Sequence, residues 1–482
     1  METKTNTKNP EKLYIILDPY FIRNVIMREY RRIFEDKRVY MLKDYFNIWS
    51  ILRIATYYFF FMLLFWGSKS KLGTKEIHDD YNSLETMKSL RGFAAIGVIL
   101  HHISQEDAFQ KAKVLSPFVN AGAFFVAIFF FCSGYGLLKS LDTKENYLKG
   151  FIRKRIVLSI MIPFYVNVIL YGIYEYFLAG VKWPKERWIW NFTGLTMMNV
   201  YAWFPIVLAI LYLVFFLCFR FIKNRPVCFV IIALAILGLG VGFCYNGHFA
   251  WWHGPKNWWQ GGAYQPKWWQ EQKILWFSGE WWVNSAIAFL IGLLFAQFET
   301  KIASFFKRLY AVKFHILLLL TYLAYLLSNY GQDHFGYWSE FWKKGPRFYD
   351  KLYTYLCQLP LFALLGLLVI VFMMKYHVEN PVTRFFGKFS LDTYLMNLMA
   401  LEISRFLMEK HYFPFKVKKY DLWVFAVTVF VLSIVLGVIE KYLTDGVKFL
   451  LTPKKKKNNK DKNSDAKQEK EQAPESVPVP EQ

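Results

Sequence analysis

The 482-residue chain is poor in charged residues and in cysteine. Asp, Glu, Lys and Arg make up 20% of it, whereas soluble domains average about 25%. Its five cysteines lie in or beside apolar stretches without paired spacing, which argues against a disulfide framework and against a metal site. No signal peptide is predicted, because the first 50 residues mix charges with short apolar clusters. Apolar residues, in contrast, make up 55% of the chain and aromatic residues 20%, which excludes a disordered protein.

The net charge of +23 has two possible meanings. In a soluble protein it would suggest a nucleic-acid partner. Here the basic residues stand in the loops between apolar runs, a distribution typical of proteins oriented in a bilayer. We therefore expect the lipid bilayer, and no nucleic acid, to be the partner of this charge.

Long apolar runs recur from residue 51 to residue 450. A bilayer core about 30 Å thick takes about 20 apolar residues per helix. The predicted fold class is therefore all-α, a polytopic membrane helix bundle with about ten transmembrane helices. The candidate spans are residues 88–106, 118–141, 154–178, 200–221, 226–245, 281–298, 312–328, 352–374, 389–407 and 421–443.

Lysine and arginine concentrate in alternate loops between these spans. Basic loops stay on the cytoplasmic side of a membrane, so we expect both termini to be cytoplasmic. The basic run at 416–419 is an exception on the opposite side. Together with the Lys- and Asn-rich composition, these features fit a multi-pass protein of a bacterial plasma membrane.

The chain divides into four predicted parts. Residues 1–50 form a cytoplasmic N-terminal segment, and residues 51–83 an interfacial helix and linker. The apolar run 51–66 has only 16 residues, so we expect it to lie in the cytoplasmic interface rather than to cross. Residues 84–445 form the transmembrane domain, and residues 446–482 a disordered, Lys-rich cytoplasmic tail without enough apolar residues to build a core.

Two ionisable residues stand out in the first predicted span. Such residues are costly inside a membrane and mark functional sites. In MKSLRGFAAIGVILHHIS, Arg91 and His102 are eleven residues apart. Eleven residues make about three helical turns, so the two side chains share a face and lie about 16 Å apart along the axis. Small residues between them, such as Gly92 and Gly97, leave room for a helix or a ligand. An interfacial arginine with boundary histidines is an equally good interpretation.

Three basic residues, Arg153 to Arg155, precede the third span. The N-terminal end of a helix also attracts anions through its dipole. A phosphate-bearing ligand such as coenzyme A would therefore bind well here. Taken alone, the ordinary accumulation of basic residues on the cytoplasmic side explains them better.

The predicted outer loop that begins NGHFAWWHGPKNWWQGGAYQPKWW contains half of the chain's 18 tryptophans by the end of residue 282. Aromatic faces flanked by amides suit sugar rings, although an aromatic belt at the membrane interface is an equally good interpretation. Two histidines in this loop have no carboxylate or cysteine at ligand spacing, so no metal site is expected. The candidate substrate-binding residues are Trp251, Trp252, Trp258 and Trp259.

Several segments occur in an informative order: RGFAAIGVILHH, FFFCSGYGLLKS, FIRKRIVLSIMIPFY, AWFPIVLAILYLVFF and GKFSLDTYLMN. In this order they resemble the integral-membrane acyltransferase family 3, over roughly residues 84–445. The resemblance implies a ten-span enzyme that moves an acyl group, commonly acetyl or succinyl, from a coenzyme A thioester to a carbohydrate or another small acceptor.

The resemblance also implies site residues. The family's histidine corresponds to His102 and its arginine to Arg91, while its basic pair corresponds to Arg153 and Arg155. The sequence departs from the family at Asn397, where many members carry histidine, and it lacks the acidic residue often found in the central span. The possible substitutes for that acid are Asp392, Glu402 and Glu280.

These observations favour an enzyme, an acyl-CoA-dependent O-acyltransferase that acts on an envelope glycan or a similar acceptor. His102 would serve as general base or as the nucleophile that carries the acyl group. Acyl-CoA, most simply acetyl-CoA, is the expected donor cosubstrate, and no tightly bound cofactor is expected. A polytopic transporter or flippase is the alternative, since it would also contain buried Arg and His, but no internal repeat supports it. The charged face of the first span disfavours a purely structural protein.

Overall fold

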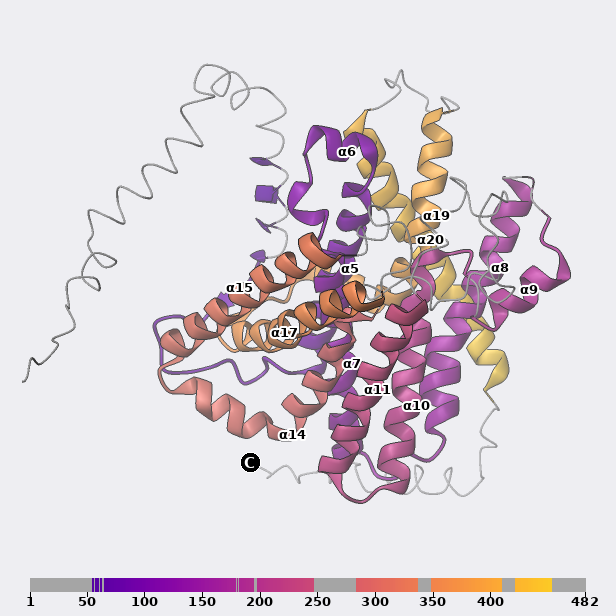
Figure 1. Cartoon of the computed structure of the whole chain (residues 1–482). Helices are drawn as coiled ribbons and strands as arrows, with labels where there is room; N and C mark the ends of the chain where they lie inside the picture. Colours follow the sequence, from indigo (N-terminus) through magenta and orange to yellow (C-terminus); the bar gives the residue numbers. More distant parts are fainter. Residues whose placement is uncertain are drawn as a thin grey trace, which may run out of the picture.

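The computed structural model describes residues 65–246, 283–336, 348–409 and 421–452, apart from Ala179, Val181, Leu195 and Thr196, together with most of 54–62. The predicted N-terminal segment 1–50 and the tail after residue 452 lie outside the described residues. The described chain is a bundle of long helices with one two-residue strand pair (Figure 1). The predicted all-α fold class is confirmed.

The elements follow the predicted spans closely, since a helix covers most of each of the ten. In chain order they are β1 (Lys69–Ser70), α5 (Leu84–Ser104), α6 (Asp107–Ala112), η1 (Ser116–Phe118), α7 (Gly122–Thr143), η2 (Ile152–Met161), α8 (Ile162–Phe177), α9 (Lys185–Phe192), η3 (Val200–Ala202), α10 (Trp203–Phe221), α11 (Arg225–Asn246), η7 (Asn284–Ala286), α14 (Ile287–Lys307), α15 (Tyr310–Phe335), α17 (Phe348–Met373), β2 (Tyr376–His377), α18 (Pro381–Lys388), α19 (Ser390–Glu409) and α20 (Leu422–Leu451).

Among the described residues, eight helices are long and apolar enough to cross a membrane. The two predicted spans outside this set are α5 and α19, which have 21 and 20 residues but carry more polar side chains. Both are largely buried in the protein, α5 against α7, α18 and α19, and α19 against α5, α8 and α20. The count of about ten spans is therefore roughly consistent with the structure. The protein is a multi-pass membrane protein whose most polar long helices lie at its centre.

Glycines allow the central helices to approach closely. A Cβ atom on Gly92 of α5 would lie 1.8 Å from the Thr383 carbonyl oxygen of α18. Gly134 of α7 and Gly292 of α14 make a reciprocal contact, because a Cβ on either one would meet the backbone of the other helix at 2.0 or 2.2 Å. Gly136 of α7, in contrast, has no such neighbour within 4 Å. The small residues of the first span thus serve a helix contact.

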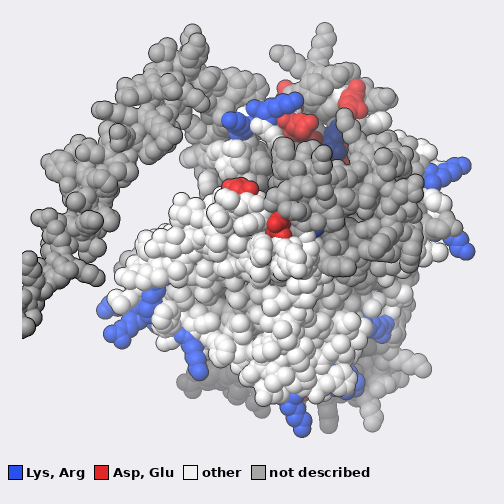
Figure 2. Space-filling view, viewed as in Figure 1, with Lys and Arg blue, Asp and Glu red and all other residues white. Residues whose placement is uncertain are grey.

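The described surface agrees with a bilayer environment. On the face shown in Figure 2, the Lys and Arg side chains lie along the margins, and a broad area between them is free of charge. In Figure 1, α10 and α11 run side by side, whereas α14, α15 and α17 are clearly inclined to them.

The described part of 54–66 packs along the bundle. The Tyr57 hydroxyl donates to the Val114 carbonyl oxygen at 3.0 Å, close to the C-terminal end of α5. The Phe65 ring lies 6.3 Å from that of Phe372, at the end of α17 that leads into β2. These two contacts tie the described part of the segment to the loop after α6 and to α17. Its interfacial position in the membrane stays a prediction.

Candidate active site

His102 lies near the C-terminal end of α5 and is only 7% exposed. Helix α5 is continuous from Leu84 to Ser104, with Ser83 as its N-cap, so the eleven-residue spacing from Arg91 is helical throughout. The neighbouring His101 points elsewhere. Its Nδ1 lies 2.8 Å from the Phe118 carbonyl oxygen, and its ring packs on Gly122, which gives it a structural role.

A hydrogen-bond chain across three helices orients the His102 ring. Its Nδ1 lies 2.5 Å from Oδ1 of Asn397 on α19. Asn397, which is fully buried, donates from Nδ2 to the Ser433 hydroxyl on α20 at 2.9 Å. The Ser433 hydroxyl in turn donates to the Val429 carbonyl oxygen at 2.7 Å.

This chain determines which nitrogen of His102 carries the proton. Because the Ser433 hydroxyl donates to a carbonyl, its oxygen accepts from Asn397 and holds the amide oxygen toward His102. Nδ1 of His102 is then the donor, and Nε2 keeps its lone pair. No described residue hydrogen-bonds to His102 Nε2, and this atom is not completely sealed by the protein. The arrangement suits proton abstraction or nucleophilic attack at Nε2.

Tyr201 fixes the plane of the same imidazole. The two rings are stacked with centroids 3.6 Å apart and an interplanar angle of 4°. Tyr201 is held in η3 by Asn199, whose Oδ1 accepts from the Tyr201 amide at 3.0 Å. The Asn199 amide group donates to the Leu395 carbonyl oxygen of α19 and to Asn167 of α8, at 2.7 and 3.0 Å. Elements η3, α8 and α19 therefore position the ring that covers His102.

Arg91 lies on α5 at the opposite end from His102 and is partly buried. No described residue accepts a hydrogen bond from its guanidinium group. It lies near enough to Cys132 of α7 and Tyr212 of α10 to interact with them electrostatically. A partly buried cation without an acceptor is available for an anionic or carbonyl ligand.

The predicted basic pair separates in the structure. Arg153 donates from Nη2 to the Leu451 carbonyl oxygen at 2.7 Å, at the end of α20. Arg155 instead lies over the Tyr147 ring, 5.4 Å from its centroid, and interacts electrostatically with Tyr212. Both arginines stand in the π-helical stretch η2. Tyr212 also interacts electrostatically with Arg91.

The proposed acidic substitutes do not bond to His102. Asp392 is buried on α19, five residues before Asn397, where it interacts with Lys441 and Glu440 of α20. Glu402 lies five residues after Asn397, about 7.5 Å along the axis in the other direction, and is hydrogen-bonded to Tyr174. Glu280 lies outside the described residues. The residue that contacts the imidazole is Asn397 itself.

Further polar side chains lie near the C-terminal end of α5, on the side of His102 that is away from Arg91. Arg405 of α19 forms an ion pair with Glu106, with 2.5 Å between Nη2 and Oε1. Tyr201 lies within electrostatic range of Arg405, Glu106 and Glu402. Hydroxyl, carboxylate and guanidinium groups are the kinds of group that bind a polyhydroxylated acceptor.

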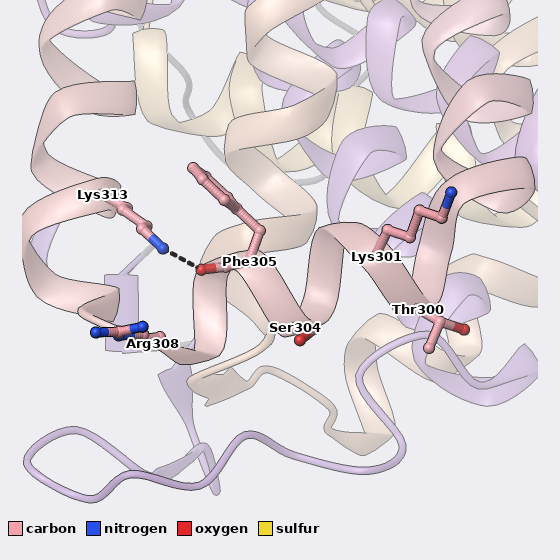
Figure 3. A pocket seen from close by; sticks show the side chains of 6 residues that line it. All are labelled: Thr300, Lys301, Ser304, Phe305, Arg308 and Lys313. Carbon is pink, nitrogen blue, oxygen red and sulfur yellow. Dashed lines mark hydrogen bonds between the residues drawn. The ribbon is translucent and has the colours of Figure 1, made fainter.

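Neither the tryptophan-rich loop nor the cavity between α14 and α15 contributes described residues to the His102 site. The four tryptophans Trp251, Trp252, Trp258 and Trp259 lie outside the described residues. A shallow cavity of about 520 Å³ lies at the junction of α14 and α15. Figure 3 shows that its basic side chains point in different directions, and Lys313 Nζ donates to the Phe305 carbonyl oxygen at 2.5 Å. They do not converge as a phosphate site would require. The cavity is lined by Thr300, Lys301, Ser304, Phe305, Arg308 and Lys313.

Sequence reasoning did not single out Tyr201 and Ser433. Tyr201 directly precedes the central segment AWFPIVLAILYLVFF, and Ser433 lies in the last predicted span, where it is one small polar residue among apolar ones. Asn397 did give a signal, because it occupies the position at which the late segment departs from the family.

Comparison with known protein families gives a match over most of the chain. Residues 84–439 match the model of acyltransferase family 3, which is described as an acyltransferase domain. No curated protein and no solved structure matches the chain. The match includes every residue of the His102 site, from Arg91 to Ser433.

Proposed function

The chain belongs to acyltransferase family 3, and from this premise we propose that it transfers an acyl group from acyl-CoA to a hydroxyl group of a carbohydrate or a similar envelope acceptor. Acetyl-CoA is the simplest donor. The single observation that carries the proposal is the oriented imidazole of His102, whose Nδ1 is engaged by Asn397 and whose Nε2 has no hydrogen-bond partner among the described residues.

The donor side lies toward Arg91 and Arg155. Coenzyme A carries several phosphate groups, and guanidinium groups are well suited to bind them. Arg91 has no acceptor among the described residues, and Arg155 is engaged chiefly with an aromatic ring. Arg91 and His102 lie about 16 Å apart on one face of α5. A pantetheine arm would lead along this face from the cation to the imidazole.

The chemical step follows from the free nitrogen. His102 Nε2 removes the proton of the acceptor hydroxyl while its oxygen attacks the thioester carbonyl carbon. Collapse of the tetrahedral intermediate breaks the carbon–sulfur bond, and the imidazolium returns its proton to the departing coenzyme A thiolate. The products are the acyl ester and free coenzyme A. The stacked Tyr201 ring and the Asn397 hydrogen bond keep the imidazole in one orientation throughout.

The acceptor side lies at the opposite end of α5, near Glu402, Arg405 and Tyr174. These residues offer donors and acceptors beyond the His102 ring. The tryptophan-rich loop, with Trp251, Trp252, Trp258 and Trp259, is proposed to bind sugar rings of the same acceptor. Donor and acceptor would thus meet His102 from opposite ends of the bundle.

The experiment is a thiol-release assay on the purified full chain in lipid nanodiscs with acetyl-CoA and a bacterial envelope glycan fraction. Wild type is expected to release free thiol, and His102→Ala to lose activity by about 10²–10⁴-fold, the usual contribution of a general base. His101→Gln is the matched control, because it keeps a donor for the Phe118 carbonyl and should retain most activity. Equal loss in both variants would remove His102 from the chemistry.

A further inference from the structure

Potential metal-binding side chains gather where the segment before α5 meets the connector between α17 and α18. His78 and Asp80 belong to the first segment, and His377 and Glu379 to the second. One ligand atom from each of His78, Asp80 and His377 lies within 4.8 Å of the other two. The two imidazole rings are 5.7 Å apart. This cluster lies apart from the residues of the His102 site.

The His78 ring is buried with an unused nitrogen. His78 is only 7% exposed, and a hydrogen bond with the backbone of Lys69 holds its ring. Nε2 is sealed from solvent and has no hydrogen-bond partner among the described residues. Because the hydrogen bond to the Lys69 backbone engages the other ring nitrogen, the lone pair is left on Nε2. A buried polar atom without a partner calls for a ligand.

The His377 ring is oriented like a metal ligand. Its Nε2 lies 3.0 Å from Oε2 of Glu379, whose other oxygen lies 3.3 Å from Arg384. A carboxylate that accepts from one imidazole nitrogen directs the lone pair of the other nitrogen toward the metal. That other nitrogen, Nδ1, lies 3.5 Å from Oδ2 of Asp80. Ligand atoms of a tetrahedral zinc site, with bonds of about 2.0–2.1 Å, are separated by about 3.4 Å.

Backbone contacts hold the two segments together independently of any metal. Strands β1 and β2 pair with Lys69 opposite His377. The His78 amide donates to the Met374 carbonyl oxygen at 2.8 Å. The Lys375 ammonium group is buried and donates to three carbonyl oxygens of the loop before α5, those of Lys71, Thr74 and Glu76. The ligands are therefore brought together by the fold, and the positive charge of Lys375 is engaged elsewhere.

We propose that His78, Asp80 and His377 form a binding site for a divalent transition metal of the zinc type, with Glu379 positioning the His377 ring. Two imidazoles and one carboxylate favour zinc over magnesium or calcium, which prefer oxygen ligands alone. Water would complete the tetrahedron at the exposed side. The Asp80 carbonyl oxygen accepts from the Thr86 hydroxyl in the first turn of α5, so the metal would fasten the start of this helix to the α17–α18 connector.

The test is zinc stoichiometry on the purified full chain without a histidine tag. The protein is stripped with EDTA, incubated with Zn²⁺, desalted and analysed by mass spectrometry of the metal. Wild type is expected to retain one zinc per chain, and His78→Gln and His377→Gln to lose it. His334→Gln, an exposed histidine of α15, is the matched control and should retain it. Wild type without stoichiometric zinc, or undiminished zinc in both site variants, would overturn the proposal.

A variant that fails to fold would also lose zinc, so a second measurement uses the intact wild-type chain. Co²⁺ bound at this site should give the intense visible absorption of tetrahedral coordination, and one equivalent of Zn²⁺ should abolish it. Asp80→Asn changes a largely exposed ligand and should weaken Co²⁺ binding at least tenfold without altering the elution profile of the protein. A weak octahedral spectrum, or unchanged affinity in Asp80→Asn, would contradict the site.

Discussion

Replacing Asn397 with leucine separates the orientation of His102 from the presence of its imidazole. Leucine has the same branched skeleton of heavy atoms, but it cannot accept from His102 Nδ1 or donate to Ser433. Each hydrogen bond between neutral groups contributes about 0.5–1.5 kcal/mol net. Loss of both would raise the barrier by about 1–3 kcal/mol, and a tenfold rate change corresponds to about 1.4 kcal/mol. We therefore expect kcat to fall by about tenfold to a hundredfold.

The assay is steady-state thiol release with acetyl-CoA and a saturating acceptor. KM for acetyl-CoA should change little, because Asn397 is fully buried and reaches the donor only through His102. The matched control is Asn284→Leu, another buried asparagine, which donates to Gln358 at 2.9 Å away from the site. It should show any general cost of removing a buried amide without the specific loss of kcat.

The double variant gives the decisive comparison. If Asn397 acts through His102, adding Asn397→Leu to His102→Ala should cause no further loss, because residues that act as one unit are not additive. A further loss equal to that of the single variant would show that Asn397 acts independently of His102, as a packing residue. Asn397→His, which places the family's residue at this position, should retain activity because an imidazole nitrogen can also accept from Nδ1.

Three more predictions follow from the same geometry. Arg91→Ala and Arg155→Ala should each raise KM for acetyl-CoA by about tenfold to a hundredfold, the value of a charge-assisted hydrogen bond. Arg153→Ala should have little effect on this KM, because its guanidinium binds the end of α20. Equal KM values in the three variants would contradict the different roles of Arg153 and Arg155. Tyr201→Leu should lower kcat by about two- to tenfold through loss of ring stacking, and Tyr201→Phe should not, as kcat measurements on both variants would show. Gly92→Ala should destabilise the protein by about 1–3 kcal/mol through overpacking, visible as a lower melting temperature in detergent; an unchanged value would be inconsistent with the close contact to Thr383.

The sequence was sufficient for the fold class, because the period and length of the apolar runs are local properties. The predicted spans and the helices coincide along most of their lengths. Even the two most polar spans were recognisable, since α5 and α19 keep a helical length of 21 and 20 residues. The family assignment is also confirmed, because the order of the segments carries it.

The details of the site depend on contacts that no local pattern encodes. His102 and Asn397 are 295 positions apart, and only the packing of α5 against α19 shows that they meet. Ser433 contributes through a third helix. The separation of Arg153 from Arg155 was accessible in principle, because residues two apart on a helix point to nearly opposite sides. The roles of these residues, and the orientation of the termini, stay predictions.

The short run 51–66 shows what a length argument can decide. Sixteen apolar residues are too few for an upright span, which favours an interfacial helix. In the structure, Tyr57 donates to the Val114 carbonyl oxygen and Phe65 lies beside Phe372. The position of this segment in the membrane stays a prediction.

Acyl groups on the envelope acceptor test the proposed acyl transfer by His102 most directly. Cells lacking the protein are complemented with wild type, His102→Ala or His101→Gln at equal membrane abundance, and the acetate released from their envelope glycans by mild alkali is quantified. Wild type and His101→Gln are expected to restore the base-labile acetate, and His102→Ala is not. Full restoration by His102→Ala would contradict a role of His102 in the transfer.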